Sequence, residues 1–142
     1  MSAYLDASAL VATLVREPGS AAIDTFLERY DGALGISEFA AAEVASAIFR
    51  LVRTHLIAQE DAEARLSDFD AWRSIRTEPI DIEPSDARLA NAYVRRIDLV
   101  LRAPDALHAA ICRRLDLMLV TLDQRLAKAA RELGIEVRVP GG

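Results

Sequence analysis

The sequence predicts an α/β fold, a three-layer α/β/α arrangement around a short, mostly parallel central sheet of four or five strands. Short apolar segments alternate with longer helical segments from one end to the other, which is the pattern of strands joined by helices. The strand segments are mostly continuous apolar runs, as expected for a parallel sheet that is covered on both faces. The chain of 142 residues has no linker, repeat or change in composition. We therefore expect a single domain over residues 1–142.

The first third of the chain predicts two strands and two helices. Ala3–Leu5 is a short apolar run and the first strand candidate. Ala7–Val15 is expected to be helical and to end before Pro18. A second helix is predicted over Ser20–Tyr30, with Ser20 as its cap. A turn then leads into a short strand over Ala33–Ile36.

The middle of the chain is mainly helical. Glu38–Thr54 is rich in alanine and contains no helix breaker, and Gln59–Arg76 follows as a second long helix. Pro79–Ile82 predicts a strand, and Ser85–Ile97 predicts the next helix. This region therefore extends the alternation of helices and strands.

The last third contains the clearest strand. Pro104–Leu115 predicts a helix, since proline is well tolerated at the start of one. Leu117–Thr121 is the most continuous apolar run bounded by charge. Gln124–Leu133 predicts a helix that glycine at position 134 closes, and Ile135–Val139 predicts the final strand.

Composition limits the class of protein. Hydrophobic residues make up 52% of the chain and charged residues 27%, which excludes a disordered chain. The one cysteine, Cys112, cannot form an internal disulfide, which fits a reducing, cytoplasmic compartment. We find no signal peptide and no apolar run long enough to span a membrane. The net charge of −5 argues against a broad basic surface for nucleic acid.

Three aspartates follow predicted strands or open a predicted helix. Asp6 ends the first strand, Asp123 follows the strongest strand, and Asp105 lies in the first turn after Pro104. Each of them alone could be an ordinary helix cap. Together they point to one rim of a parallel sheet, where carboxylates repel one another unless a cation is bound. Such a cluster suits Mg²⁺ or Mn²⁺, which prefer oxygen ligands.

Glu43 is the fourth acidic candidate. It lies inside a predicted helix on a stripe of small and apolar residues that includes Phe39 and Ala47. A carboxylate on such a stripe is costly to bury without a partner. The side chain is expected either to face solvent at the edge of the stripe or to turn inward to the same rim as the aspartates.

These pieces resemble the PIN-domain ribonucleases, and more closely the VapC-type toxins of bacterial toxin–antitoxin pairs. The matching segments are Tyr4–Leu10, Ser37–Val44, Pro104–Ala110 and Leu119–Arg125, in order along nearly the whole chain. The resemblance implies that Asp6, Glu43, Asp105 and Asp123 form an acidic quartet that is both catalytic and metal-binding. It also implies that Ser8 and Thr121 orient carboxylates or a metal-bound water.

The resemblance implies a metal-dependent ribonuclease that uses Mg²⁺ or Mn²⁺, with Asp6 and Asp105 as the principal ligands. It further implies RNA as substrate, a cognate antitoxin as inhibitor and a homodimer. Four of the 22 acidic residues would then lie in the site, and the rest of the chain would be nearly neutral. The net charge is thus compatible with RNA binding that depends on metal and on a local arginine patch.

Several other residues keep two interpretations. His108, three residues after Asp105, is either a general acid or a buried histidine beside the site. Arg102 is a weak candidate for contacting RNA phosphates. The aromatic residues of the two long helices either belong to the core or form a surface for the dimer or the antitoxin; these are Phe49, Phe69 and Trp72.

Other functions remain alternatives at this point. Phosphatases and receiver domains also place acids at strand ends, but a phosphatase needs a second aspartate where this chain has Ser8, and a receiver needs an acidic pair where Asp6 stands alone. A PIN nuclease of RNA processing without an antitoxin and a non-catalytic PIN-like binding module remain open. The presence of all four acids argues against the non-catalytic module.

Overall fold

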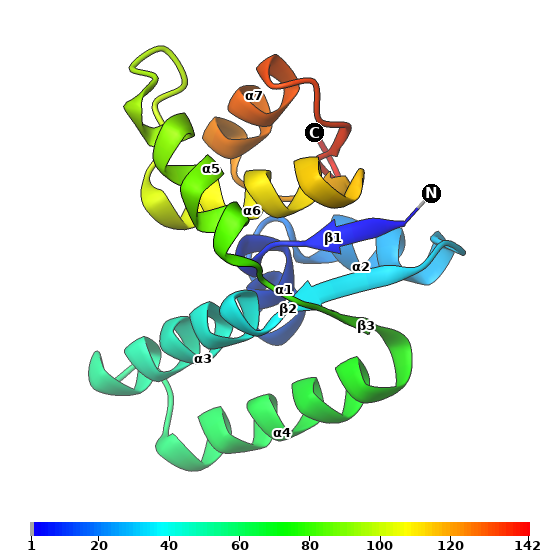
Figure 1. Cartoon of the computed structure of the whole chain (residues 1–142). Helices are drawn as coiled ribbons and strands as arrows, with labels where there is room; N and C mark the ends of the chain where they lie inside the picture. Colours follow the sequence, from blue (N-terminus) through cyan, green and yellow to red (C-terminus); the bar gives the residue numbers. More distant parts are fainter. Residues whose placement is uncertain (1) are drawn as a thin grey trace.

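Residues 2–142 are described by a computed structural model in which helices and strands alternate along the chain (Figure 1). The strands are β1 (Ala3–Leu5), β2 (Leu34–Ser37), β3 (Glu78–Ile80), β4 (Met118–Val120) and β5 (Val137–Arg138). The helices are α1 (Ala7–Leu14), α2 (Ser20–Arg29), α3 (Glu38–Arg53), α4 (Gln59–Arg76), α5 (Pro84–Arg95), α6 (Ala103–Leu115) and α7 (Gln124–Glu132). The predicted order of elements is confirmed.

Within this part of the chain, five strands form one parallel sheet in the order β3-β2-β1-β4-β5. The chain builds outward from β1 through β2 to β3, and then crosses to the other side of β1 to form β4 and β5. The predicted α/β class with a parallel sheet is therefore confirmed. In open sheets of this kind, ligands bind beyond the carboxyl ends of the strands where the order reverses. Here that point lies between β1 and β4.

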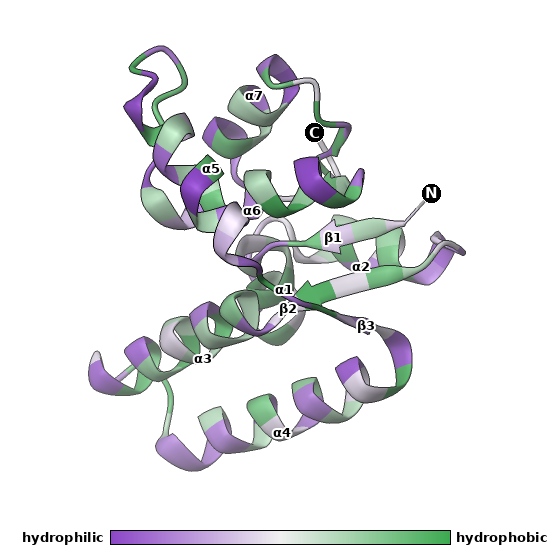
Figure 2. Cartoon of the chain, viewed as in Figure 1, coloured by the Kyte–Doolittle hydropathy of each residue, from purple (hydrophilic) through white to green (hydrophobic). Residues whose placement is uncertain are grey.

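The helices cover both faces of the sheet. Helices α1 to α4 pack together on one face, and α5 to α7 pack on the other (Figure 1). Successive strand residues point to opposite faces, so Ala3 and Leu5 enter the first core and Tyr4 the second. The three central strands β1, β2 and β4 are buried throughout, because helices cover both of their faces. Figure 2 shows purple and green alternating along α4, which buries Ala62 and Phe69 and exposes its other side.

Some element boundaries differ from the prediction. The final strand is reduced to two residues, because it pairs only with Leu119 and Val120 of the short β4. The predicted cap at Ser20 is wrong: Gly19 holds the cap position. The Ser20 hydroxyl instead donates to the carbonyl of Val15 at 3.0 Å and closes the loop before α2.

An ion pair joins α5 to α6 away from the switch point of the sheet. Asp86 is 1% exposed, and Arg114 binds it through Nε at 2.7 Å and Nη2 at 2.9 Å. Asp86 also accepts a hydrogen bond from the amide of Glu83 and so closes a capping box at the start of α5. Burial opposes ionisation, but the hydrogen bonds from Arg114 and Glu83 hold the pKa of Asp86 below its ordinary value.

None of the helices in residues 2–142 combines the length and the apolar character needed to cross a lipid bilayer.

Candidate active site

Asp6 ends β1 and caps α1. Its Oδ1 accepts hydrogen bonds from the amide of Ala9 at 3.0 Å and the hydroxyl of Ser8 at 2.7 Å, and its Oδ2 accepts one from the Thr121 hydroxyl at 2.6 Å. The residue is 3% exposed. Burial raises the pKa of Asp6, although all three hydrogen bonds act to lower it. The carboxylate is thus held by neutral donors, which orient it without cancelling its charge.

The two hydroxyls that bind Asp6 are themselves fixed by backbone amides. The amide of Leu122 donates to Ser8 Oγ at 2.9 Å, and the amide of Asp123 donates to Thr121 Oγ1 at 3.0 Å. Since each hydroxyl oxygen already accepts a hydrogen, its own hydrogen is free to point at Asp6. The loop after β4 therefore orients the carboxylate at the end of β1, in the manner that the resemblance implies.

Two further acids reach the same rim. Asp123 caps α7, where its Oδ1 accepts from the amides of Arg125 at 2.9 Å and Leu126 at 3.2 Å. Asp105 lies half-buried in the first turn of α6. Burial raises the pKa of Asp105, and the negative charges of Asp123 and Asp6 raise it further. Asp6 and Asp123 therefore cap helices, and both lie close enough to Asp105 to repel its charge.

Glu43 reaches from α3 toward α6. Its Oε1 lies 2.5 Å from Nε2 of His108, which is 2% exposed, whereas the Glu43 side chain is 29% exposed. The Glu43 side chain is therefore turned toward His108 on α6 and stays partly exposed. His108 is buried beside the acidic rim and contacts Glu43 directly.

The imidazole of His108 continues into a buried hydrogen-bonded chain. Its Nδ1 lies 2.6 Å from Tyr4 Oη, which lies 2.8 Å from Ser37 Oγ. Ser37 caps α3 by accepting from the amide of Ala40 at 3.1 Å. Sequence reasoning missed Tyr4 and Ser37, because one reads as part of an apolar strand and the other as a strand end. The available signal was the hydroxyl of a tyrosine in a buried strand, which requires a partner.

A cavity of about 630 Å³ adjoins this rim. Ser8 of α1 and Glu43 of α3 line it together with two exposed arginines, Arg50 and Arg102. Arg102 is the candidate that the sequence indicated. Arg50 was missed, although its position seven residues after Glu43 places it on the same face of α3.

The predicted acids share a rim but do not form a closed cage. Within residues 2–142, no group of three or more His, Cys, Asp or Glu side chains could by itself hold a metal ion. Glu43 is engaged with His108, and Asp123 with the amides of α7. In the same part of the chain, Asp6, Asp105 and Asp123 form no ion pair with arginine or lysine.

Several further residues are buried or take part in ion pairs within the fold. Cys112 is buried, as predicted for a small hydrophobic residue. Arg114 is engaged by Asp86, and Arg96 by Asp98, so neither guanidinium is free. Phe69 belongs to the core, whereas Trp72 is partly buried.

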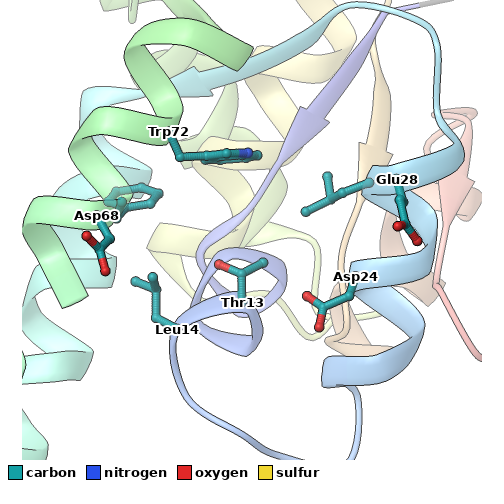
Figure 3. A pocket seen from close by; sticks show the side chains of 8 residues that line it. Thr13, Leu14, Asp24, Glu28, Asp68 and Trp72 are labelled. Carbon is teal, nitrogen blue, oxygen red and sulfur yellow. The ribbon is translucent and has the colours of Figure 1, made fainter.

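Trp72 lines a second cavity, of about 490 Å³, between α1, α2 and α4 (Figure 3). In Figure 3, Trp72 projects from α4 across the cavity toward α2, which carries Asp24 and Glu28, and Asp68 lies beside α4. Asp24 is paired with Arg16 at 2.8 Å. The lining thus combines apolar side chains with acids; it consists of Thr13, Leu14, Asp24, Leu27, Glu28, Asp68, Phe69 and Trp72.

Comparison with solved structures shows the same fold in known toxins and complexes. The chain is similar to VapBC2 from Rickettsia felis, solved bound to a DNA fragment from their promoter, with 17% identity, a TM-score of 0.70 and coverage of 97% of this chain and 98% of that one. It is similar to VapC20 of Mycobacterium tuberculosis, a Sarcin-Ricin loop cleaving toxin, with 14% identity, a TM-score of 0.72 and coverage of 91% and 95%. FitAcB from Neisseria gonorrhoeae matches with 18% identity, a TM-score of 0.66 and coverage of 99% and 98%.

A comparison with the curated proteins gives no match. The model of the PIN domain family matches residues 3–132, which include β1, β4 and all four predicted acids. The match agrees with the resemblance in the four sequence segments and with the fold of the structural neighbours. The chain therefore belongs to the PIN domain family.

Proposed function

We propose that residues 1–142 form a single PIN domain that hydrolyses RNA phosphodiester bonds with a divalent metal ion, as the toxin of a VapBC-type pair restrained by a cognate antitoxin. The observation that supports the proposal is the half-buried Asp105, whose pKa is raised by burial and by the charges of Asp123 and Asp6 near the switch point of the sheet. We expect the protein to act in the cytoplasm, where its RNA substrate is, and as a homodimer.

The residues at the rim fit Mg²⁺ or Mn²⁺. Carboxylate oxygens are the ligands that these ions prefer, and Mg²⁺ is commonly bound through one or two carboxylates with water completing its shell. An open rim of separate carboxylates matches that requirement better than a closed cage would. Burial raises the pKa values of Asp6 and Asp105, and the negative charges of Asp123 and Asp6 raise that of Asp105 further. A cation would relieve this unfavourable charge.

In this proposal Asp6 and Asp105 are the principal metal ligands, and Glu43 and Asp123 bind directly or through water. A bound divalent ion supplies charge stabilisation at the phosphoryl oxygens and a more acidic water for the attack on phosphorus. Ser8 and Thr121 keep Asp6 in one orientation, so that little reorganisation is needed when the substrate arrives.

The cavity beside Glu43 is the proposed entry for the RNA backbone. Arg50 and Arg102 line it from α3 and from the start of α6. Guanidinium groups bind phosphate oxygens with good geometry, which positions a strand without reading its bases. This local pair supplies the positive charge that the chain as a whole lacks.

The cavity between α1, α2 and α4 is the proposed docking site for the antitoxin (Figure 3). Its floor holds the apolar side chains of Leu14 and Trp72, and Glu28 and Asp68 add negative charge without an ion-pair partner in residues 2–142. An amphipathic segment with basic residues would complement both features. We therefore propose that the antitoxin presents such a segment.

The proposed nuclease activity is tested with Asp105→Asn and with a matched control at the end of the same helix, Asp116→Asn. Asp105 opens α6, whereas Asp116 is exposed at its end in a left-handed conformation that asparagine tolerates. Each variant is incubated with single-stranded RNA in the presence of Mg²⁺, Mn²⁺ or a chelator. We expect cleavage by the unmodified protein and by Asp116→Asn only with metal, and a loss of about a hundredfold or more in Asp105→Asn.

Cleavage by Asp105→Asn at the rate of the unmodified protein would contradict the assignment. Binding of metal and RNA without cleavage in any form would instead identify a non-catalytic module. Circular dichroism of both variants verifies that the fold is retained.

The proposed docking of the antitoxin is tested by reversing the charge of two side chains that line the cavity. The double variant Glu28→Lys/Asp68→Lys is compared with Asp31→Lys, which changes charge in an exposed turn outside the cavity. The binding partner is the small protein encoded by the neighbouring gene. We expect the double variant to bind it at least about tenfold more weakly. Equal affinity would place the partner elsewhere, and a neighbouring gene without such a partner would favour a nuclease of RNA processing.

A further inference from the structure

We infer that His108 is a positioning residue of the proposed site, whose Nε2 holds the Glu43 carboxylate beside the acidic rim. Tyr4 and Ser37 hold the imidazole from the other side. The inference rests on the proposed function, since it assigns Glu43 a place beside the metal.

A row of hydrogen bonds holds the imidazole on both sides. The amide of Ala40 donates to Ser37 Oγ at 3.1 Å, and Ser37 Oγ lies 2.8 Å from Tyr4 Oη. Tyr4 Oη lies 2.6 Å from Nδ1 of His108. With Nδ1 held in this way, Nε2 on the other side of the ring is directed at Oε1 of Glu43.

The row of hydrogen bonds from Ser37 to Glu43 is enclosed by the core. Tyr4 and Ser37 are fully buried, and the row connects β1, the start of α3 and the middle of α6. The rings of Tyr4 and Phe39 lie 5.5 Å and 5.6 Å from the imidazole. Within residues 2–142, no buried side-chain nitrogen or oxygen lacks a hydrogen-bond partner. A change at any member would therefore leave a buried polar group unpaired.

The consequence concerns the one acid of the rim that lies on α3. Asp6 is oriented by hydroxyls and Asp123 by amides, whereas Glu43 is oriented by its contact with His108. His108 occupies Oε1 and leaves Oε2 as the oxygen that can face a cation or its water. Such partners of a ligand commonly change metal affinity 10- to 100-fold when they are removed.

The test measures Mn²⁺ binding by calorimetry for the unmodified chain, His108→Leu, His108→Gln and Asp105→Asn. We expect the dissociation constant of His108→Leu to rise about 10- to 100-fold. His108→Gln should stay within about threefold of the unmodified chain, because its amide NH₂ takes the place of Nε2–H. A merely structural role of His108 would lower the melting temperature equally with and without Mn²⁺ and leave the dissociation constant unchanged, which would overturn the inference.

The outcomes separate the two levels of the proposal. If the unmodified chain binds no Mn²⁺, the proposed function is wrong and the inference falls with it. If Asp105→Asn loses Mn²⁺ binding while His108→Leu binds as the unmodified chain does, the proposed function stands and only the inference is wrong.

Discussion

Asp6 and Asp86 are both buried aspartates at the starts of helices, but their charges are balanced differently. Asp86 accepts two hydrogen bonds from the guanidinium of Arg114. Asp6 accepts its hydrogen bonds from two hydroxyls and an amide. The pKa of Asp86 lies below its ordinary value because these hydrogen bonds outweigh burial, whereas burial raises the pKa of Asp6.

The difference indicates that Asp86, and not Asp6, serves mainly to stabilise the fold. At the α5–α6 contact, the chain provides its own cation, and the pair can contribute to stability once it is formed. At the rim between β1 and β4, the chain orients a carboxylate and leaves its charge in place. A folded protein tolerates such uncompensated charge where it serves binding or catalysis. The predictions below compare the two regions directly.

The largest expected effect is on catalysis. Asp6→Asn should reduce metal-dependent RNA cleavage by roughly a thousandfold, equivalent to about 4 kcal/mol of transition-state stabilisation. Asp86→Asn should keep its activity per folded molecule, because Asp86 lies at the α5–α6 contact. Initial rates are normalised to the folded fraction from circular dichroism. Equal losses in the two variants would remove the distinction between the regions.

Arg102 and Arg114 allow the same two regions to be compared. Arg102→Ala should raise KM for RNA about tenfold with little change in stability, because Arg102 is exposed and lines the cavity beside Glu43. Arg114→Ala should lower stability and leave KM of the folded protein unchanged, because its partner is Asp86. Steady-state kinetics and urea unfolding of both variants measure the two effects. An unchanged KM in Arg102→Ala would exclude this arginine from the RNA path.

Without metal, substitutions at Asp86 and at Asp6 should change the stability of the protein in opposite directions. Asp86→Ala should lower the free energy of unfolding by about 2 kcal/mol, since it removes hydrogen bonds to a charged group and a capping interaction. Asp6→Asn should raise the melting temperature by about a few degrees in a chelator, because it removes a buried charge but keeps an acceptor for Ala9. Thermal melts settle the signs, and a destabilised Asp6→Asn would mean that the rim is not strained by charge.

The smallest effect is the dependence of the Asp86 contribution on pH. A carboxyl whose pKa is lowered by folding stabilises the native state above its unfolded pKa of about 3.9 and loses that contribution as the pH falls through the lower native value. The stability difference between the unmodified chain and Asp86→Asn should thus be constant from pH 7 to about pH 5 and shrink below about pH 4. Urea midpoints across this range measure it; a difference that persists at pH 2 would not come from the charge.

Much of the site could be predicted from local signals. Asp6 and Asp123 follow apolar runs, and parallel strands bring their carboxyl ends to one edge, so their shared rim follows from chain order. The position of Glu43 on a helix was equally clear, but its direction was not. That direction depends on His108, which is 65 residues away in the chain.

The sequence alone determined the α/β class, the parallel sheet, the order of elements and the places of Asp6 and Asp123 after their strands, because periodicity and strand ends are local properties. Only the tertiary structure decided which partner each polar group finds. It joined Tyr4 to His108 across 104 residues and gave Asp86 the cation that Asp6 does not have. The physical reason is that a hydrogen bond or ion pair needs contact within a few ångströms, and packing of distant segments sets that contact.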